Sequence, residues 1–237
     1  MPRDYQPVHA IDPIELVHQE IQRTQPDLAE LTRVAEGLRA DPVSLRTSLR
    51  GLLESRAQLE EVADRSYLHP NGFAKVMLQM GGGYRIRLHV WRQGDRKYGF
   101  DANPHGHRWD FASWVVVGAL RETTFSETPG HRQYERSSYR RRANGASFME
   151  ATGDAGLEPL HDTIREAGTV YARSRSELHS VVPVGTDVVA SLVLQRPPSG
   201  EFAAVFLRHG KPADYKERPL TVGELEAVIA EVTAARW

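Results

Sequence analysis

Two histidines, His105 and His107, stand one residue apart, and a carboxylate follows at Asp110. They precede a run of β-forming residues, Ser113–Val117, so the pair is expected on a strand or at its entry. Alternate side chains of an extended chain share a face, which places these two imidazoles about 6.6 Å apart along the backbone. Both rings could therefore reach one metal ion. Neutral imidazole binds iron, zinc, nickel and copper, so the spacing predicts a metal site.

The composition limits the class of protein and the kind of ligand. The chain has 237 residues, 40% hydrophobic and 26% charged, as is typical of globular proteins. It contains no cysteine, so disulfides, thiolate ligands and a cysteine nucleophile are excluded, and His, Asp and Glu remain as metal ligands. The formal charge of −1 argues against nucleic acid or a membrane surface as partner. Met1–Tyr5 starts no apolar leader and no run could span a bilayer, so we expect a cytoplasmic protein.

Helices are expected at both ends of the chain. Within residues 1–65, Asp12 and Asp41 each precede a proline, and an N-cap followed by proline at the first helical position is a helix start signal. The apolar stripe that begins after Asp41 continues on one face as far as Val62. These residues are expected to pack as a short helical bundle against the rest of the chain. In residues 211–237, a Thr-x-x-Glu capping box predicts a closing helix.

Residues 66–210 carry the pattern of short strands. Tyr84–Trp91 alternates most clearly, with apolar side chains at even positions and large polar side chains or tryptophan at odd ones. The polar face is expected either to line a cavity or to meet solvent. Residues 143–160 are rich in small and turn residues and show no clear strand pattern. Further strands are expected at residues 73–80, 113–117, 120–124, 134–142, 169–172, 188–194 and 201–207. The pattern predicts a mainly β protein, a small barrel or sandwich with helical ends.

Two stretches of the sequence resemble the motifs of the cupin superfamily. In the first, Gly99 precedes His105 and His107, and Gly118 closes the hairpin. In the second, Leu178-His179-Ser180-Val181 is followed by Val189-Ala190-Ser191-Leu192-Val193-Leu194-Gln195-Arg196-Pro197-Pro198. The sequence of this second motif is similar to that of the cysteine-dioxygenase-like branch of the superfamily. Leu88–Gly94 also resembles that branch. The resemblance implies a cupin-type β-barrel, or double-stranded β-helix. It also implies that His105, His107 and His179 bind iron and that O2 is a co-substrate.

The chain departs from the family pattern at several positions. Phe111 stands where many cupins place a glutamate ligand, with Asp110 beside it. Asp110 is expected either to act as a ligand through a bulge or to accept a hydrogen bond from a ligand histidine, and both interpretations stay open. In thiol dioxygenases an early-strand arginine holds the substrate carboxylate, and the nearest residue here is Lys75. Val193 and Gln195 replace the expected histidine and tyrosine, so hydroxylation is favoured over thiol dioxygenation.

A two-iron site is the sharper alternative. His89 and Glu122 would add ligands to the three histidines and Asp110, as in a cupin-type diiron hydroxylase family that the sequence also resembles. Asp110 and Glu122 are then candidate catalytic carboxylates as well. By the simpler interpretation, Glu122 is a strand carboxylate paired with Arg121 or Arg140, and His89 lies beside its strand neighbours on the polar face.

The expected function is a non-haem iron oxygenase that hydroxylates an anionic organic substrate, natural-product or carrier-linked, with one iron or two and with an electron donor as partner. A homodimer is compatible with the sequence. The candidate substrate-binding residues are Lys75, Arg85, Arg87, Trp91, Trp109, Phe111 and Arg140, and Trp114 is expected to help exclude water. The alternatives are a mononuclear thiol dioxygenase, a zinc or nickel enzyme on the same barrel, and a non-catalytic metal-binding cupin module.

Overall fold

The computed structural model describes residues 12–92, 103–129, 133–141, 147–185, 187–209 and 217–237. The helices are α1 Pro13–Thr24, α2 Leu28–Ala40, α3 Pro42–Glu54, α4 Arg56–Arg65 and α5 Val222–Ala234. The strands are β1 Tyr67–His69, β2 Phe73–Gly81, β3 Tyr84–Trp91, β4 Phe111–Val117, β5 Ala119–Thr128, β6 Tyr134–Arg141, β7 Ser147–Glu166, β8 Val170–Arg173, β9 Leu178–Val184, β10 Val189–Gln195, β11 Ala203–Arg208 and β12 Arg218–Pro219. The N-terminal residues Met1–Tyr5, and Gly94 and Gly99 of the expected motifs, lie outside this description.

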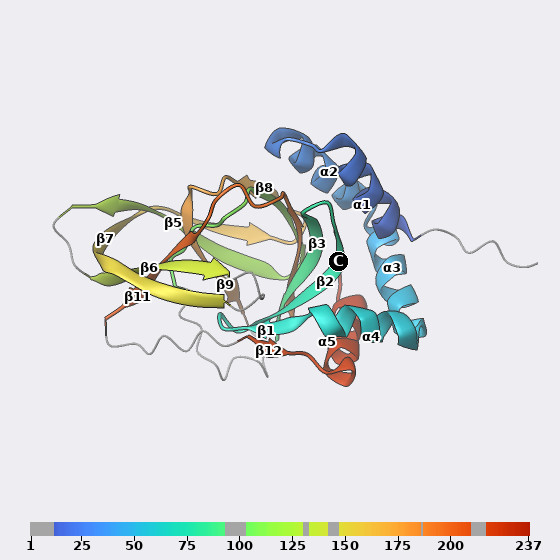
Figure 1. The fold of residues 1–237 in the computed structure, drawn as a ribbon. Helices are drawn as coiled ribbons and strands as arrows, with labels where there is room; N and C mark the ends of the chain where they lie inside the picture. The colour runs from blue at the N-terminus through green and yellow to red at the C-terminus, as the bar shows by residue number, and fades with distance from the viewer. Residues whose placement is uncertain (1–11, 93–102, 130–132, 142–146, 186, 210–216) are drawn as a thin grey trace, which may run out of the picture.

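Two antiparallel sheets face each other in the described part of the chain. Sheet A has the order β12-β1-β2-β3-β10-β4-β8, and sheet B has the order β11-β6-β7-β5-β9. All helices lie on one side of the molecule and sheet B on the other, with β2 and β3 between them (Figure 1). The arrangement confirms the expected mainly β fold with N-terminal helices and a C-terminal helix.

The helices cover the outer face of sheet A, and strand alternation explains why. On β3 the even-numbered Ile86, Leu88 and Val90 pack in one core with the buried residues of the helices, such as Leu31 and Leu225. The odd-numbered Arg87, His89 and Trp91 of the same strand line the cavity between the sheets. The alternating pattern of β3 therefore separates a helix-facing side from a cavity-facing side, and the cavity interpretation of its polar face is confirmed.

The helix start signals are confirmed. The side chain of Asp12 accepts a hydrogen bond from the backbone N–H of Ile14 at 2.9 Å, and the capping box of Thr221 and Glu224 opens α5. The stripe that runs to Val62 is two helices, because Ser55 leaves the helical conformation (φ −117°, ψ 101°) and caps α4. Among the described residues, no helix is long and apolar enough to cross a bilayer.

The strand pattern misses the short strands β1 and β12, strand β9, and, most prominently, β7. β7 is a 20-residue strand that includes most of the region in which no strand pattern was visible. It pairs with β6 on one side and with β5 on the other, with a register shift on each side. Its glycines and its proline disfavour a strand locally, but partners on both sides impose one.

Candidate metal centre

The His-x-His segment closes sheet B. The edge strands of that sheet are β9 and β11, and His105 pairs with both, through His179 on β9 and Val205 on β11. The backbone N–H groups of His105 and His179 each donate to the other's carbonyl, at 2.9 and 3.0 Å. The first and third candidate ligands are thus direct cross-strand neighbours.

Gly106 lets the two histidines of the segment lie close to the neighbouring loop. Its N–H donates to the carbonyl of Ala204, and the N–H of His107 donates to the carbonyl of Arg175. A Cβ at Gly106 would lie 3.3 Å from that carbonyl oxygen and 3.4 Å from Leu178 Cδ2. The extended segment therefore turns both imidazoles to the interior and its side-chain-free position to the loop.

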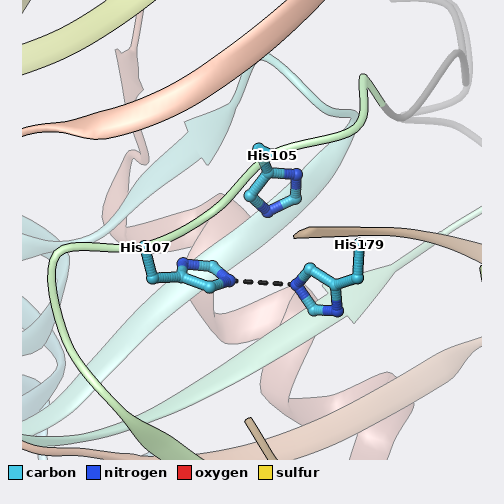
Figure 2. Close-up of side chains that lie close together, drawn as sticks. All are labelled: His105, His107 and His179. Atoms are coloured by element: carbon cyan, nitrogen blue, oxygen red, sulfur yellow. Dashed lines mark hydrogen bonds between the residues drawn. The ribbon is translucent and has the colours of Figure 1, made fainter. Parts of the chain in front are cut away.

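The three imidazoles meet at one point (Figure 2). One potential ligand atom from each of His105, His107 and His179 lies within 4.8 Å of the other two. The Nε2 atoms of His107 and His179 are 2.9 Å apart. His105 Nδ1 lies 2.9 Å from the carbonyl oxygen of Asn103, and His179 Nδ1 lies 2.8 Å from Glu122 Oε1. Because an oxygen acceptor requires N–H at each Nδ1, both rings present an unprotonated Nε2 to the centre.

Burial keeps two imidazoles of the centre, those of His105 and His107, neutral. Burial, and then the neighbouring His179, lower the pKa of His105 to about 3. Burial also lowers the pKa of His107 well below the ordinary histidine value, with further contributions from the other two rings. Neutral rings have free lone pairs, and metal binding needs those lone pairs.

A cavity of about 110 Å³ opens beside the three histidines. Its wall is largely aromatic and includes two buried cations, Lys75 and Arg87, which are 7% and 2% exposed. Described lining residues outside the histidine triad include Tyr67, His69, Asn71, Phe73, Lys75, Arg87, His89, Trp91, Trp109, Phe111, Tyr139, Tyr171, Ser191 and Val193. The cavity can hold a small organic molecule against the open side of the metal site.

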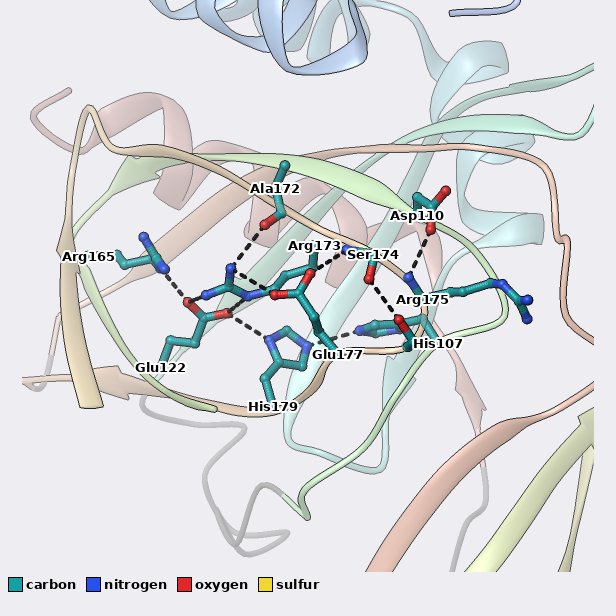
Figure 3. A network of polar contacts seen from close by, with 11 residues as sticks. His107, Asp110, Glu122, Arg165, Ala172, Arg173, Ser174, Arg175, Glu177 and His179 are labelled. Carbon is teal, nitrogen blue, oxygen red and sulfur yellow. Dashed lines mark hydrogen bonds and ion pairs between the residues drawn. The ribbon is translucent and has the colours of Figure 1, made fainter. Parts of the chain in front are cut away.

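A buried carboxylate lies behind His179. Glu122 is 1% exposed, and its carboxylate lies between the His179 ring and two guanidinium groups (Figure 3). Arg173 donates from Nε to Oε1 at 2.9 Å and from its terminal nitrogen to Oε2 at 2.8 Å, and Arg165 donates to Oε2. Burial alone would raise the pKa of Glu122, but His179 and Arg173 outweigh it and lower the pKa to about 2. Glu122 is therefore an anion, and both its oxygens accept hydrogen bonds from Arg165, Arg173 or His179.

The structure gives the other candidate ligands different partners. Asp110 accepts hydrogen bonds from the backbone N–H of Arg175 at 2.8 Å and from the side chain of Arg196 at 3.1 Å. These bonds connect the His-x-His segment (residues 103–110, which we call the ligand segment) to the loop after β8 and to the end of β10. The His89 ring packs against Phe73 at a tilt of 31°, with ring centroids 4.5 Å apart, and its Nε2 has no hydrogen-bond partner among the described residues. The group of potential metal ligands found there contains the three histidines and not Asp110, Glu122 or His89.

The substrate-binding candidates divide into two groups. Those that line the cavity are Lys75, Arg87, Trp91, Trp109 and Phe111. Arg85 and Arg140 are not among the described lining residues, and Arg140 lies over the ring of Phe202, 5.3 Å from its centroid. Trp114 faces the helices, with its ring centroid 6.2 Å from that of Trp237, so its expected place in the pocket is wrong.

Sequence reasoning missed several residues of the site. Arg165 and Arg173, the partners of Glu122, had no local signal. His69 and Tyr67, on the short strand β1, line the cavity, and so does Tyr171, on β8. Even-odd alternation extended from β3 to its partner β10 would have found Ser191, which lies directly opposite His89.

The donor set fits a metal ion. Three imidazoles converge, two of them oriented through Nδ1 by oxygen acceptors, and the cavity leaves room on their open side. Three nitrogen ligands with open positions suit a divalent transition metal that binds further ligands, including O2 or substrate.

No protein-family model and no curated protein matches the sequence. Among solved structures, hydroquinone 1,2-dioxygenase PnpCD in complex with Cd2+ and 4-hydroxybenzonitrile is 11% identical over 60% of this chain and 72% of that chain, with a TM-score of 0.33. An oxalate oxidase is 13% identical over 69% of this chain and 73% of that one, at 0.33. Oxalate decarboxylase from Bacillus subtilis is 10% identical over 58% of this chain, at 0.34, and the match spans only 29% of the decarboxylase chain. The site, and not these likenesses, carries the functional argument.

Proposed function

We propose that this chain is a cupin-type, non-haem iron oxygenase that uses O2 to hydroxylate a small organic anion. The observation that carries the proposal is the convergence of His105, His107 and His179 at the wall of an aromatic cavity. When bound by these imidazoles, Fe(II) would supply electron transfer to O2, which zinc cannot. The preference for iron over other metals comes from the resemblance of the two motifs to cysteine-dioxygenase-like cupins.

The described cavity wall supports an anionic substrate. Arg87 is almost fully buried; it donates to Gln195, and its Nε has no partner among the described residues. Lys75 lies on the neighbouring strand, opposite His89. Two cations at a low-dielectric wall favour a negatively charged group such as a carboxylate. Trp91, Trp109 and the other aromatic rings would hold the apolar part of the substrate and keep water out.

Hydroxylation inserts one atom of O2 into a C–H bond and reduces the other to water. The balance requires two electrons and two protons, so the proposal includes an electron donor as a partner. Within the site, the chain's own groups bind and orient the substrate, and the three histidines hold the metal.

We propose one metal ion per chain. The carboxylates of Asp110 and Glu122 already bind donors in their surroundings, and a second iron would require one or both of them to turn away from those donors. The diiron alternative is tested by the same measurement as the function itself.

The test is metal content and O2 consumption. We expect the chain purified without chelator to contain about one iron, measured by mass spectrometry, and His179→Ala to lose it. His161→Ala removes an exposed histidine on β7 and is the matched control, for which no loss is expected. Stoichiometric zinc without O2 consumption would overturn the oxygenase proposal. Iron without O2 consumption, tested with carboxylate substrates and a reductant, would favour the non-catalytic module. Two irons per chain, lowered by Glu122→Ala, would favour the diiron form.

A further inference from the structure

Glu122, Arg165 and Arg173 form a closed group behind one ligand histidine. The three side chains come from three strands, β5, β7 and the end of β8, and so from both sheets. Glu122 is fully buried, and the two arginine side chains are only 15% and 16% exposed. Figure 3 shows that the His179 ring continues the group toward the metal centre. We call this set, Glu122 with Arg165 and Arg173, the carboxylate clamp.

The clamp restricts what Glu122 can do. Arg173 binds both carboxylate oxygens in a fork, and Arg165 binds one of them. The Arg165 guanidinium also lies over the ring of Tyr171, 4.3 Å from its centroid, so it is held from a second side. A bidentate arginine fixes the plane of a carboxylate as well as its charge. The oxygen that faces His179 is therefore held at a defined place.

A surface ion pair would not need this arrangement. Burying a carboxylate is costly unless its oxygens are fully hydrogen-bonded, and a buried pair is often no more stable than apolar residues of the same volume. Besides the hydrogen bonds from the two arginines, Glu122 has one further side-chain contact in the clamp: its Oε1 lies 2.8 Å from His179 Nδ1. The structure thus places a fixed anionic acceptor at the one ring nitrogen of His179 that does not face the other two histidines.

We propose that the carboxylate clamp is a positioning unit of the metal centre. It fixes His179 as the tautomer with the proton on Nδ1, so that Nε2 is always the nitrogen presented to the metal, and its negative charge strengthens the imidazole as a ligand. Arg165 and Arg173 act through Glu122, and Glu122 acts through His179. The proposal rests on the proposed metal centre, but it does not depend on the identity of the metal or on oxygenase activity.

The clamp can be tested with Co2+, whose absorption spectrum reports its ligands. Glu122→Gln keeps the size of the side chain and removes its charge. We expect it to weaken Co2+ affinity of the metal-free protein by about 10–100-fold, the usual effect of losing such a hydrogen-bond partner, and to change the Co2+ spectrum. The matched control is Glu177→Gln, because Glu177 also pairs with Arg173, at 3.4 Å, but does not contact His179. We expect its Co2+ affinity to stay within about twofold of the parent.

Two further measurements separate positioning from a merely structural role. Nitrogen-15 NMR of the metal-free protein should show the proton of His179 on Nδ1, and a mixture of tautomers in Glu122→Gln. Should Glu122→Gln fail to fold, Arg173→Gln replaces it, with a smaller loss of Co2+ affinity expected in the same direction. Unchanged affinity and spectrum in a folded clamp variant would overturn the proposal. If His179→Ala loses Co2+ binding but the clamp variants do not change it, the clamp proposal alone is refuted. If His179→Ala still binds Co2+, the metal centre itself is refuted.

Discussion

Gly118 is the corner at which the chain leaves sheet A and enters sheet B, and Gly118→Ala tests how tightly that corner is packed. The glycine has a φ of +73°, and a Cβ there would lie 2.8 Å from Val189 Cγ2 and 3.1 Å from the carbonyl oxygen of Val188. The left-handed conformation costs an alanine about 1–2 kcal/mol. Forced contacts with a packed strand add about 1–3 kcal/mol. We expect the free energy of unfolding to fall by about 2–5 kcal/mol in total.

Gly168→Ala is the matched control. Gly168 also has a positive φ, +88°, but a Cβ there would have no described atom beyond its chain neighbours within 4 Å. We expect only the conformational cost at this position, about 1–2 kcal/mol. Urea unfolding followed by circular dichroism measures both variants under the same conditions. Equal losses in the two variants would refute the argument that the corner is tightly packed against β10.

Two more predictions concern the helical side of the molecule. Leu31 lies in the fully buried face of α2, so Leu31→Ala should lower the free energy of unfolding by about 2–5 kcal/mol. Val43 is exposed, so Val43→Ala should change it by no more than about 0.5 kcal/mol. Equal losses of unfolding free energy in urea for the two variants would contradict the packing of α2. The hydrogen bond to Arg218, followed by that to Thr221, lowers the pKa of Glu224 from 4.5 to about 2. Because the folded-state pKa is the lower one, the stabilisation of the fold by ionised Glu224 is complete above pH 4.5 and is lost as the pH falls toward 2. Glu224→Gln should therefore destabilise the protein at neutral pH by about 0.5–2 kcal/mol, and the difference in urea unfolding should shrink by about pH 3; a difference that does not change with pH would contradict the assignment.

The pair His105 and His107 could be predicted because its geometry is local. A spacing of two places both side chains on one face of any extended segment. The third histidine could be placed only through the resemblance of a second motif, since the pairing of His105 with His179 joins residues far apart in the chain. The even-odd pattern of β3 likewise predicted a two-sided strand, but the sequence left open whether its polar side met water or a cavity.

The partners of Glu122 were beyond local reasoning. Its chain neighbour Arg121 was an expected partner, but adjacent strand residues point to opposite faces, and Arg121 lies exposed with its Nε 3.8 Å from Asp162. The expectation of a pair with Arg121 is wrong for this reason. Arg165 could not be considered, because the small residues of β7 hid the strand that carries it. An error in one strand thus hid one of the two arginines of the clamp.

The ligand segment links the fold to the proposed chemistry. His105 hydrogen-bonds through its backbone to β9, while Pro104 and Gly106 hydrogen-bond to β11, so the same few residues close sheet B and present two imidazoles. The third imidazole, on β9, is held by that backbone pairing on one side and by the carboxylate clamp on the other. Main-chain hydrogen bonds thus set where the ligands stand, and the buried carboxylate sets which nitrogen of His179 faces inward. Because both constraints belong to the protein itself, the three histidines are organised for a metal before any metal binds.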